Sequence, residues 1–140
     1  MRENRMSMSG VAGFIITLAM CQAANAAPIT SQVINSITPN AGQVVTVTST
    51  AAYTNTSGGF QMAVLQNSYR VVGAPAWTVM AGSQGSSMMN GQGCNLKAVG
   101  MFTCPGPAGV QIEIRTQLIN PMNPAAAPID TQTATITVGP

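Results

Sequence analysis

Histidine is absent from this chain of 140 residues, and charged residues make up only 6% of it. Without histidine, the chain lacks the usual general base, every histidine-containing catalytic triad and most zinc sites. An ordinary soluble domain has about a quarter of its residues charged, so no basic patch for nucleic acid or acidic lipid is expected here. We therefore expect no nucleic-acid partner, no metal and no other cofactor.

Carboxylates are also scarce. Beyond the N-terminal segment discussed next, Glu113 and Asp130 are the only two, and a glycosidase needs a pair of carboxyl groups flanking its substrate. Glu113 shares the outward face of a predicted strand with Arg115, so the simpler interpretation is a solvated surface charge. We expect a protein that is not an enzyme.

The N-terminal segment has the layout of a secretory signal peptide. Arg2 and Arg5 precede the apolar residues 11–20, and Ala24-Asn25-Ala26 places small residues where a signal peptidase cleaves. A permanent membrane helix needs roughly 20 apolar residues, about twice the length of this run. We predict a signal peptide at residues 1–26 and a mature chain with no transmembrane segment, located in the periplasm, on the cell surface or outside the cell.

A second interpretation of this segment involves Cys21. The residues before it resemble the lipobox of bacterial lipoproteins, although Met20 is larger than the residue that such a box requires. Lipidation of Cys21 therefore stays open as an alternative. Cleavage after Ala26 would instead remove this cysteine and leave an even pair.

The predicted mature chain has an almost uncharged surface. Of its 114 residues, only five are charged: Arg70, Lys97, Glu113, Arg115 and Asp130. Uncharged polar residues must then cover the surface, which lacks the charges that normally discourage strand edges from pairing between molecules. We expect the partner to be a second copy of the chain or another envelope protein.

Alternation of apolar and polar residues predicts strands along most of the chain. Residues 120–128 hold three prolines and are expected to form a surface excursion, and residues 82–93 are expected to form a loop. We predict an all-β, immunoglobulin-like antiparallel β-sandwich of about seven to nine strands in a single domain at residues 27–140. The expected strands are residues 29–37, 43–53, 60–66, 69–72, 76–80, 110–118 and 133–138.

Residues 94–104 form a predicted hairpin in which residues 98–100 are the loop and Gly100 takes the left-handed position. In that register Cys94 lies directly opposite Cys104, close enough to form a disulfide in an oxidising compartment. Such a bridge would stabilise the fold by roughly 2 to 3 kcal/mol. The two cysteines are too far apart in sequence for a typical redox motif, so the predicted disulfide is structural.

Trp77 is the single tryptophan, and Tyr69 and Arg70 lie near it in sequence. A flat aromatic face buries the apolar hydrogens of a sugar ring while neighbouring polar groups bond its hydroxyls. These three residues are therefore candidates for a glycan or small-ligand platform. The alternative is that Trp77 packs in the core of the sandwich.

The first predicted strand, with Ile29, Val33 and Ile37, is the candidate for assembly. Freed by signal cleavage, it could add as a strand to a neighbouring sandwich. The simpler alternative is that it forms the first strand of its own sheet.

One series of motifs runs through most of the chain: Gly42 before residues 45–48, residues 54–58, Cys94, Phe102-Thr103-Cys104, and Pro107-Ala108-Gly109 leading into residues 110–114. In this order the motifs resemble the immunoglobulin-like repeat domains of bacterial surface proteins. The resemblance covers roughly residues 41–119 and implies a sandwich module with a structural or adhesive role. A subunit of a chaperone-usher type pilus is similar in plan. The expected function is that of a non-enzymatic structural or adhesive protein of the bacterial surface or exterior, with self-assembly into filaments as one form of the structural role. The alternative is a carbohydrate- or small-ligand-binding module.

Overall fold

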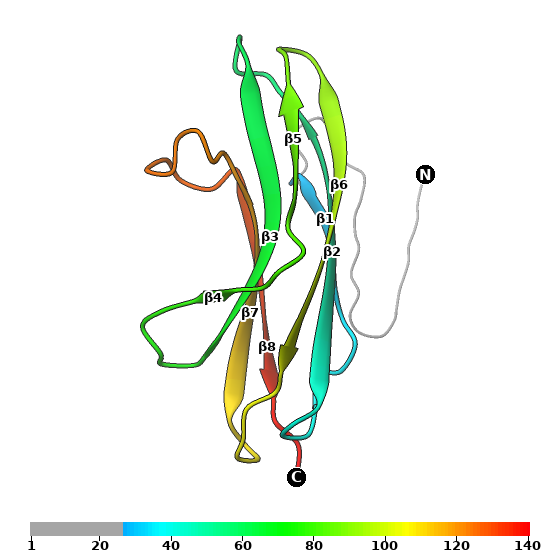
Figure 1. Cartoon of the computed structure of the whole chain (residues 1–140), viewed down its shortest axis with the longest axis vertical. Helices are drawn as coiled ribbons and strands as arrows, with labels where there is room; N and C mark the ends of the chain where they lie inside the picture. The colour runs from blue at the N-terminus through cyan, green and yellow to red at the C-terminus, as the bar shows by residue number, and fades with distance from the viewer. Residues whose placement is uncertain (1–26) are drawn as a thin grey trace, which may run out of the picture.

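The computed structural model describes residues 27–140, so the predicted signal peptide and Cys21 lie outside the described residues. Within that range the chain forms strands and no helix, in two antiparallel sheets that face each other (Figure 1). This confirms the predicted all-β sandwich. The strands are β1 (Ile29–Ile34), β2 (Val44–Thr54), β3 (Gln61–Val71), β4 (Thr78–Val79), β5 (Gln84–Met88), β6 (Gly93–Thr103), β7 (Gln111–Ile119) and β8 (Asp130–Thr137).

The smaller sheet has three strands in the order β1-β2-β6. The larger has five, in the order β4-β3-β7-β8, with β5 also paired to β3. β3 joins two segments that the sequence suggested were separate strands, and β5 lies where a loop was predicted. Polar residues interrupt the apolar alternation in both strands, so the pattern divided β3 into two and did not reveal β5.

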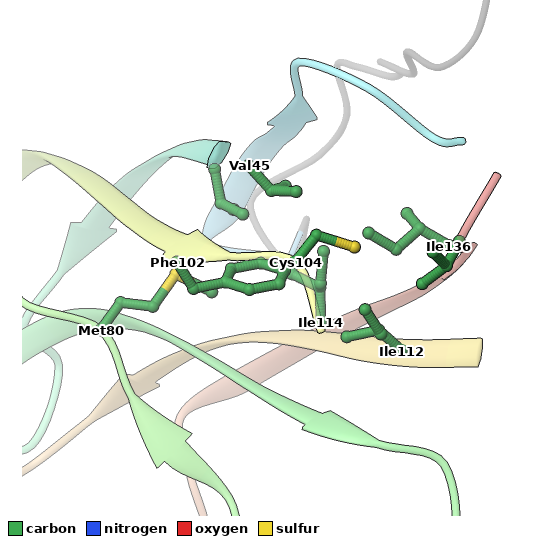
Figure 2. Packing of buried hydrophobic residues seen from close by; sticks show 9 residues of the cluster. Val45, Met80, Phe102, Cys104, Ile112, Ile114 and Ile136 are labelled. Carbon is green, nitrogen blue, oxygen red and sulfur yellow. The ribbon is translucent and has the colours of Figure 1, made fainter. Parts of the chain in front are cut away.

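Alternation along the strands fills the space between the sheets. Val45 and Val47 of β2 face Ile112 and Ile114 of β7, and each of the four side chains is fully buried. Burying such a side chain contributes about 1.5 to 3 kcal/mol. Figure 2 shows this cluster, with Met80 beside Phe102 and Cys104 near Ile136. A second cluster fills the other half of the sandwich: Ile29, Ala51, Ala63, Leu65, Met88, Leu96, Ala98 and Leu118.

A buried polar layer separates the two apolar clusters. The Asn67 Oδ1 atom accepts hydrogen bonds from the hydroxyls of Ser49, at 2.9 Å, and Thr116, at 2.7 Å. Asn67 Nδ2 donates to the carbonyls of Val47 and Ala98 on the opposite sheet, at 3.4 and 3.3 Å. A buried polar group without partners is destabilising, so these bonds fix the relative position of the two sheets.

The predicted hairpin at residues 94–104 is wrong. β6 is one continuous strand, paired with β2 along its length from Gly93 to Thr103. Cys94 lies at its start and Cys104 directly after its end, and both are free cysteines. Ten residue steps of about 3.3 Å place their Cα atoms roughly 33 Å apart, far beyond the reach of a disulfide. The predicted Cys94–Cys104 bridge is therefore absent.

Gly100 explains the error. A Cβ atom at this position would lie 2.7 Å from the Cβ and Sδ atoms of Met80, closer than real side chains approach. The glycine therefore makes room for Met80 in the middle of a strand. Sequence alone does not separate this use of glycine from its use in a turn.

The N-terminal segment is the first strand of its own sheet, the second of the two alternatives. β1 pairs with β2, and an irregularity between Ile29 and Ser31 inserts one extra residue. Because one extra residue reverses which face each side chain takes, Ile29 is buried whereas Val33 is 50% exposed. Ile37 lies beyond the strand and is 64% exposed. The three candidates for assembly therefore do not share a face.

Candidate functional site

The outer face of the five-stranded sheet carries a cluster of charged and aromatic side chains. Arg70 of β3 lies opposite Glu113 of β7, and Ser68 lies opposite Arg115 in the same register. Their neighbours Ile112 and Ile114 face the core and are fully buried, so alternation directs Glu113 and Arg115 outward. Two adjacent strands thus bring together two pairs of polar side chains, and the two members of each pair are 43 or more residues apart in sequence.

Trp77 completes this cluster. β4 pairs with β3 through Thr78 and Tyr69, which places Trp77 beside Arg70 at the edge of the same face. The connecting segment forms a loop on the outer side of the sheet (Figure 1). The Trp77 ring centroid lies 4.3 Å from the Arg70 Cζ atom and 4.1 Å from the Arg115 Cζ atom. Stacking of this kind contributes about 0.5 to 2 kcal/mol for each cation and holds the indole in place.

The cluster carries more positive than negative charge. The Arg70 Nε atom donates to Glu113 Oε1 at 2.9 Å, and the two side chains are 27% and 30% exposed. Burial, and secondarily the nearby charge of Arg70, lower the pKa of Arg115. Arginine nevertheless remains protonated at neutral pH. The cluster therefore holds two guanidinium groups and one carboxylate, which pairs with Arg70.

Two buried polar atoms at this position lack hydrogen-bond partners in the described part of the chain: the Ser68 hydroxyl oxygen and Arg115 Nε. The residues that carry them are directly opposite each other on β3 and β7. Leaving a buried donor or acceptor unsatisfied costs about 1 to 3 kcal/mol. Both unsatisfied side-chain atoms therefore lie at one place, in the cluster that also holds Trp77.

An uncharged polar row lies next to the cluster on the same face. Gln66 of β3 pairs with Gln117 of β7, which pairs with Thr131 of β8. Gln117 Nε2 donates to the Thr131 hydroxyl at 3.5 Å. These amides and hydroxyls can both donate and accept hydrogen bonds, so this face offers an aromatic ring, cations and neutral polar groups side by side.

The structure brings together two of the three predicted platform residues, Trp77 and Arg70. Tyr69 faces the other side of β3, where its ring stacks on Phe102 at 4.2 Å with an interplanar angle of 11°. Consecutive residues of a strand point to opposite faces, so Tyr69 and Arg70 could not both face the platform. Arg115 was missed as a site residue because only cross-strand register brings it to Trp77.

The outer position of Trp77 also differs from the core alternative. Its indole is half-buried on the outer face, and it belongs to neither apolar cluster of the interior. The aromatic side chains of the interior are instead Tyr69 and Phe102, which pack with the first cluster, and Tyr53, which packs against the second. The core of this sandwich is filled without its single tryptophan.

The two carboxylates considered as a catalytic pair lie apart. Asp130 pairs with Leu118, five residues along β7 from Glu113, which corresponds to roughly 17 Å. Paired glycosidase carboxyl groups lie about 5 to 9.5 Å apart. Asp130 has another role: its Oδ2 atom accepts the Ile29 backbone N–H at 2.9 Å and tethers β1 to the opposite sheet.

Residues 27–140 contain no group of three or more His, Cys, Asp or Glu side chains that could hold a metal ion. No helix suited by length and apolar character to span a membrane occurs in that range either.

No protein-family model and no curated protein matches this chain. Solved structures do resemble it. A cycloisomaltooligosaccharide glucanotransferase of Paenibacillus sp., complexed with cycloisomaltoheptaose, is 14% identical, with a TM-score of 0.50 over 80% of this chain and 14% of the other. A β-glucuronidase of glycoside hydrolase family 2 is 12% identical, with a TM-score of 0.54 over 88% of this chain and 12% of the other. This chain thus spans only a small part of each, and at these identities the likeness shows the β-sandwich fold alone.

Proposed function

We propose that this chain is a non-enzymatic, exported protein of the bacterial surface or exterior that acts by adhesion. Its ligand-binding surface is the outer face of the five-stranded sheet. The observation that carries the proposal is the gathering of Trp77, Arg70 and Arg115 on this face, around two buried atoms without partners. A protein gains nothing in stability from such unsatisfied atoms, whereas a ligand can satisfy them.

A carbohydrate is the ligand class that fits this face best. Sugars present many hydroxyl groups, which the row of Gln66, Gln117 and Thr131 can bond without any charge. An indole supplies the apolar contact. The two solved structures above have the same fold within proteins that act on glucans and glucuronides, which is in keeping with a glycan ligand.

Trp77 provides the experiment, because the chain has no other tryptophan. We expect indole fluorescence of the mature chain to change on titration with at least one member of a glycan panel. Arg70→Ala should weaken that response, since Arg70 stacks on the ring. Lys97→Ala is the matched control, because Lys97 lies on the other sheet. Fluorescence unchanged across the panel, together with no binding by calorimetry, would contradict the proposal.

Self-assembly is a second candidate function, favoured by the outer face of the three-stranded sheet. Val33, Thr48 and Val99 form one row across its three strands, and Met101 beside them is 63% exposed. The strand-donation route receives no support, since β1 pairs within its own sheet. Light scattering of residues 27–140 over a range of concentrations tests this role, and a strict monomer at all of them would exclude it.

Export itself is testable separately. N-terminal sequencing of the protein recovered from cells should begin at Ala27 if the signal peptide is cleaved as proposed. A chain that begins at Cys21 and carries lipid would show the alternative. A chain that retains residues 1–20 would contradict export by either route.

A further inference from the structure

The charges of the Trp77 cluster are incompletely balanced. Glu113 bonds Arg70, and within residues 27–140 Arg115 has no ion-pair partner. Arg115 is half-buried, and this burial is the main cause of its lowered pKa. A partly desolvated cation without a partner attracts an anion more strongly than one in water. One additional negative charge would therefore balance the charges of the site.

The unsatisfied atoms indicate what kind of anion would fit. Arg115 Nε and the Ser68 hydroxyl are hydrogen-bond donors on adjacent strands, directly opposite each other. A carboxylate has two oxygens, so one can accept from the edge of the guanidinium group while the other accepts from the serine. Because both atoms are buried, a covering side chain must move when the ligand enters. Trp77, stacked on Arg115, is expected to respond.

The surroundings favour a sugar acid over other anions. The excess is a single positive charge, so the cluster can balance one carboxylate of the ligand. The neighbouring row of Gln66, Gln117 and Thr131 is uncharged and suits hydroxyl groups. An acidic peptide would present apolar or charged side chains to this row.

We infer that the outer face of the five-stranded sheet recognises acidic polysaccharides, with one uronic-acid carboxylate bound between Arg115 and Ser68. This inference rests on the proposed glycan-binding function and narrows its ligand class. Arg70 remains paired with Glu113, and its guanidinium group also stacks on the Trp77 indole and supports it. The sugar ring that carries the carboxylate lies against Trp77, and the next ring lies over the glutamine row.

The test titrates the mature chain with tetragalacturonic acid and follows Trp77 fluorescence and calorimetric heat. The matched ligand is the carboxyl-reduced tetrasaccharide, which keeps the hydroxyls and removes the charges. We expect the acidic ligand to bind at least about tenfold more tightly than the reduced one, since charge-assisted hydrogen bonds are about twice as strong as neutral ones. Raising the salt concentration should weaken binding of the acidic ligand only.

Four variants separate the roles of the residues. Arg115→Gln should lower affinity for the acidic tetrasaccharide about tenfold or more and lower the affinity for the reduced one by a smaller factor. Ser68→Ala should lower affinity a few-fold with no loss of thermal stability, because it deletes an unsatisfied buried hydroxyl. Glu113→Gln should raise affinity for the acidic ligand, since it increases the excess positive charge. Lys97→Gln removes one cation from the other sheet and should change affinity less than twofold.

Three outcomes would overturn the inference. Equal affinity for the acidic and reduced tetrasaccharides would refute acidic specificity while leaving the proposed glycan binding intact. Binding of polyglutamate at least as tightly as tetragalacturonic acid would show that the occupant is an acidic peptide. No binding of either tetrasaccharide or of any neutral glycan would refute the proposed function as well. If Arg115→Gln fails to fold, Ser68→Ala with full stability and unchanged affinity would by itself refute the carboxylate position.

Discussion

The two outer faces of this sandwich differ sharply, although both are built from strands with the same alternation. The face of the three-stranded sheet carries hydroxyl and apolar side chains, with Lys97 as its charged residue. The face of the five-stranded sheet gathers Arg70, Glu113 and Arg115 around Trp77. Alternation along the strands therefore decides which side chains reach the outer faces. The register between neighbouring strands decides which of those side chains lie together, and so what each face can bind.

The register between strands matters because the outward residues of a single strand are too few and too far apart to form a binding site. Ser68 and Arg70 become a site only because β7 places Arg115 and Glu113 opposite them. On the other sheet, the same kind of pairing places Thr48 between Val33 and Val99. One face thus suits a polar, charged ligand, and the other suits an uncharged surface.

The largest expected effect comes from the buried layer on which both faces depend. Asn67→Ala removes the acceptor of the Ser49 and Thr116 hydroxyls and should destabilise the fold by about 3 kcal/mol. The outward neighbour Gln66 is the control, and Gln66→Ala should change stability by less than about 0.5 kcal/mol. Urea unfolding measures both. An Asn67→Ala protein as stable as the parent would show that the layer does not hold the sheets in register.

Trp77→Ala is expected to separate the two faces most clearly. Loss of the indole should lower glycan affinity about 30-fold, the effect of removing a central aromatic contact. It should also destabilise the fold by about 1 to 2 kcal/mol through loss of two cation–π contacts. Val99→Ala on the other face should leave affinity within twofold in the same calorimetric titration. Equal losses for both variants would mean that binding does not depend on the five-stranded face.

Val99→Lys sharpens the comparison from the other side. A charge at the β6 end of the Val33–Thr48–Val99 row should abolish any concentration-dependent association of the mature chain. It should leave glycan binding and Trp77 fluorescence unchanged, since Val99 lies on the opposite sheet. Light scattering and the fluorescence titration measure the two properties independently. Association that persists in Val99→Lys would assign self-contact to another surface.

The smallest expected effect concerns the two free thiols. Burial raises the pKa of both Cys94 and Cys104, so the folded chain holds the thiol protons more tightly than the unfolded chain. The resulting stabilisation is complete below the unfolded pKa and is lost as pH rises through the folded pKa. The urea midpoint should therefore fall between about pH 8 and 10, and Cys104→Ala should reduce that fall. A midpoint that rises over this range would contradict the assigned direction.

Much of the fold could be predicted from alternation, and the exceptions have identifiable causes. Residues 43–53 and 110–118 were recognised because one face is apolar and the other polar, and they correspond to β2 and β7. β5 was missed because its sequence, QGSSM, contains one apolar residue. The hairpin was wrong because Gly100 was interpreted as a turn residue, while the structure uses it for contact with Met80.

The candidate site was only partly predictable for a similar reason. Trp77 and Arg70 were identified because they are close in sequence, and they do lie together. Tyr69 was included on the same ground, yet strand alternation turns it toward Phe102. Arg115 lies 38 residues after Trp77, and no local pattern connects them. The contact of Arg115 with Trp77 depends on the register in which β3 pairs with β7, and a single sequence does not reveal that register.

The central claim is that this protein recognises its ligand through the outer face of the five-stranded sheet. The most direct test is backbone amide chemical-shift mapping of the mature chain during titration with tetragalacturonic acid. We expect the chemical-shift changes to centre on Ser68, Trp77 and Arg115 and to extend to Gln117, with none at Val33 or Val99. Shifts confined to the three-stranded face, or absent for this and every neutral glycan, would contradict it.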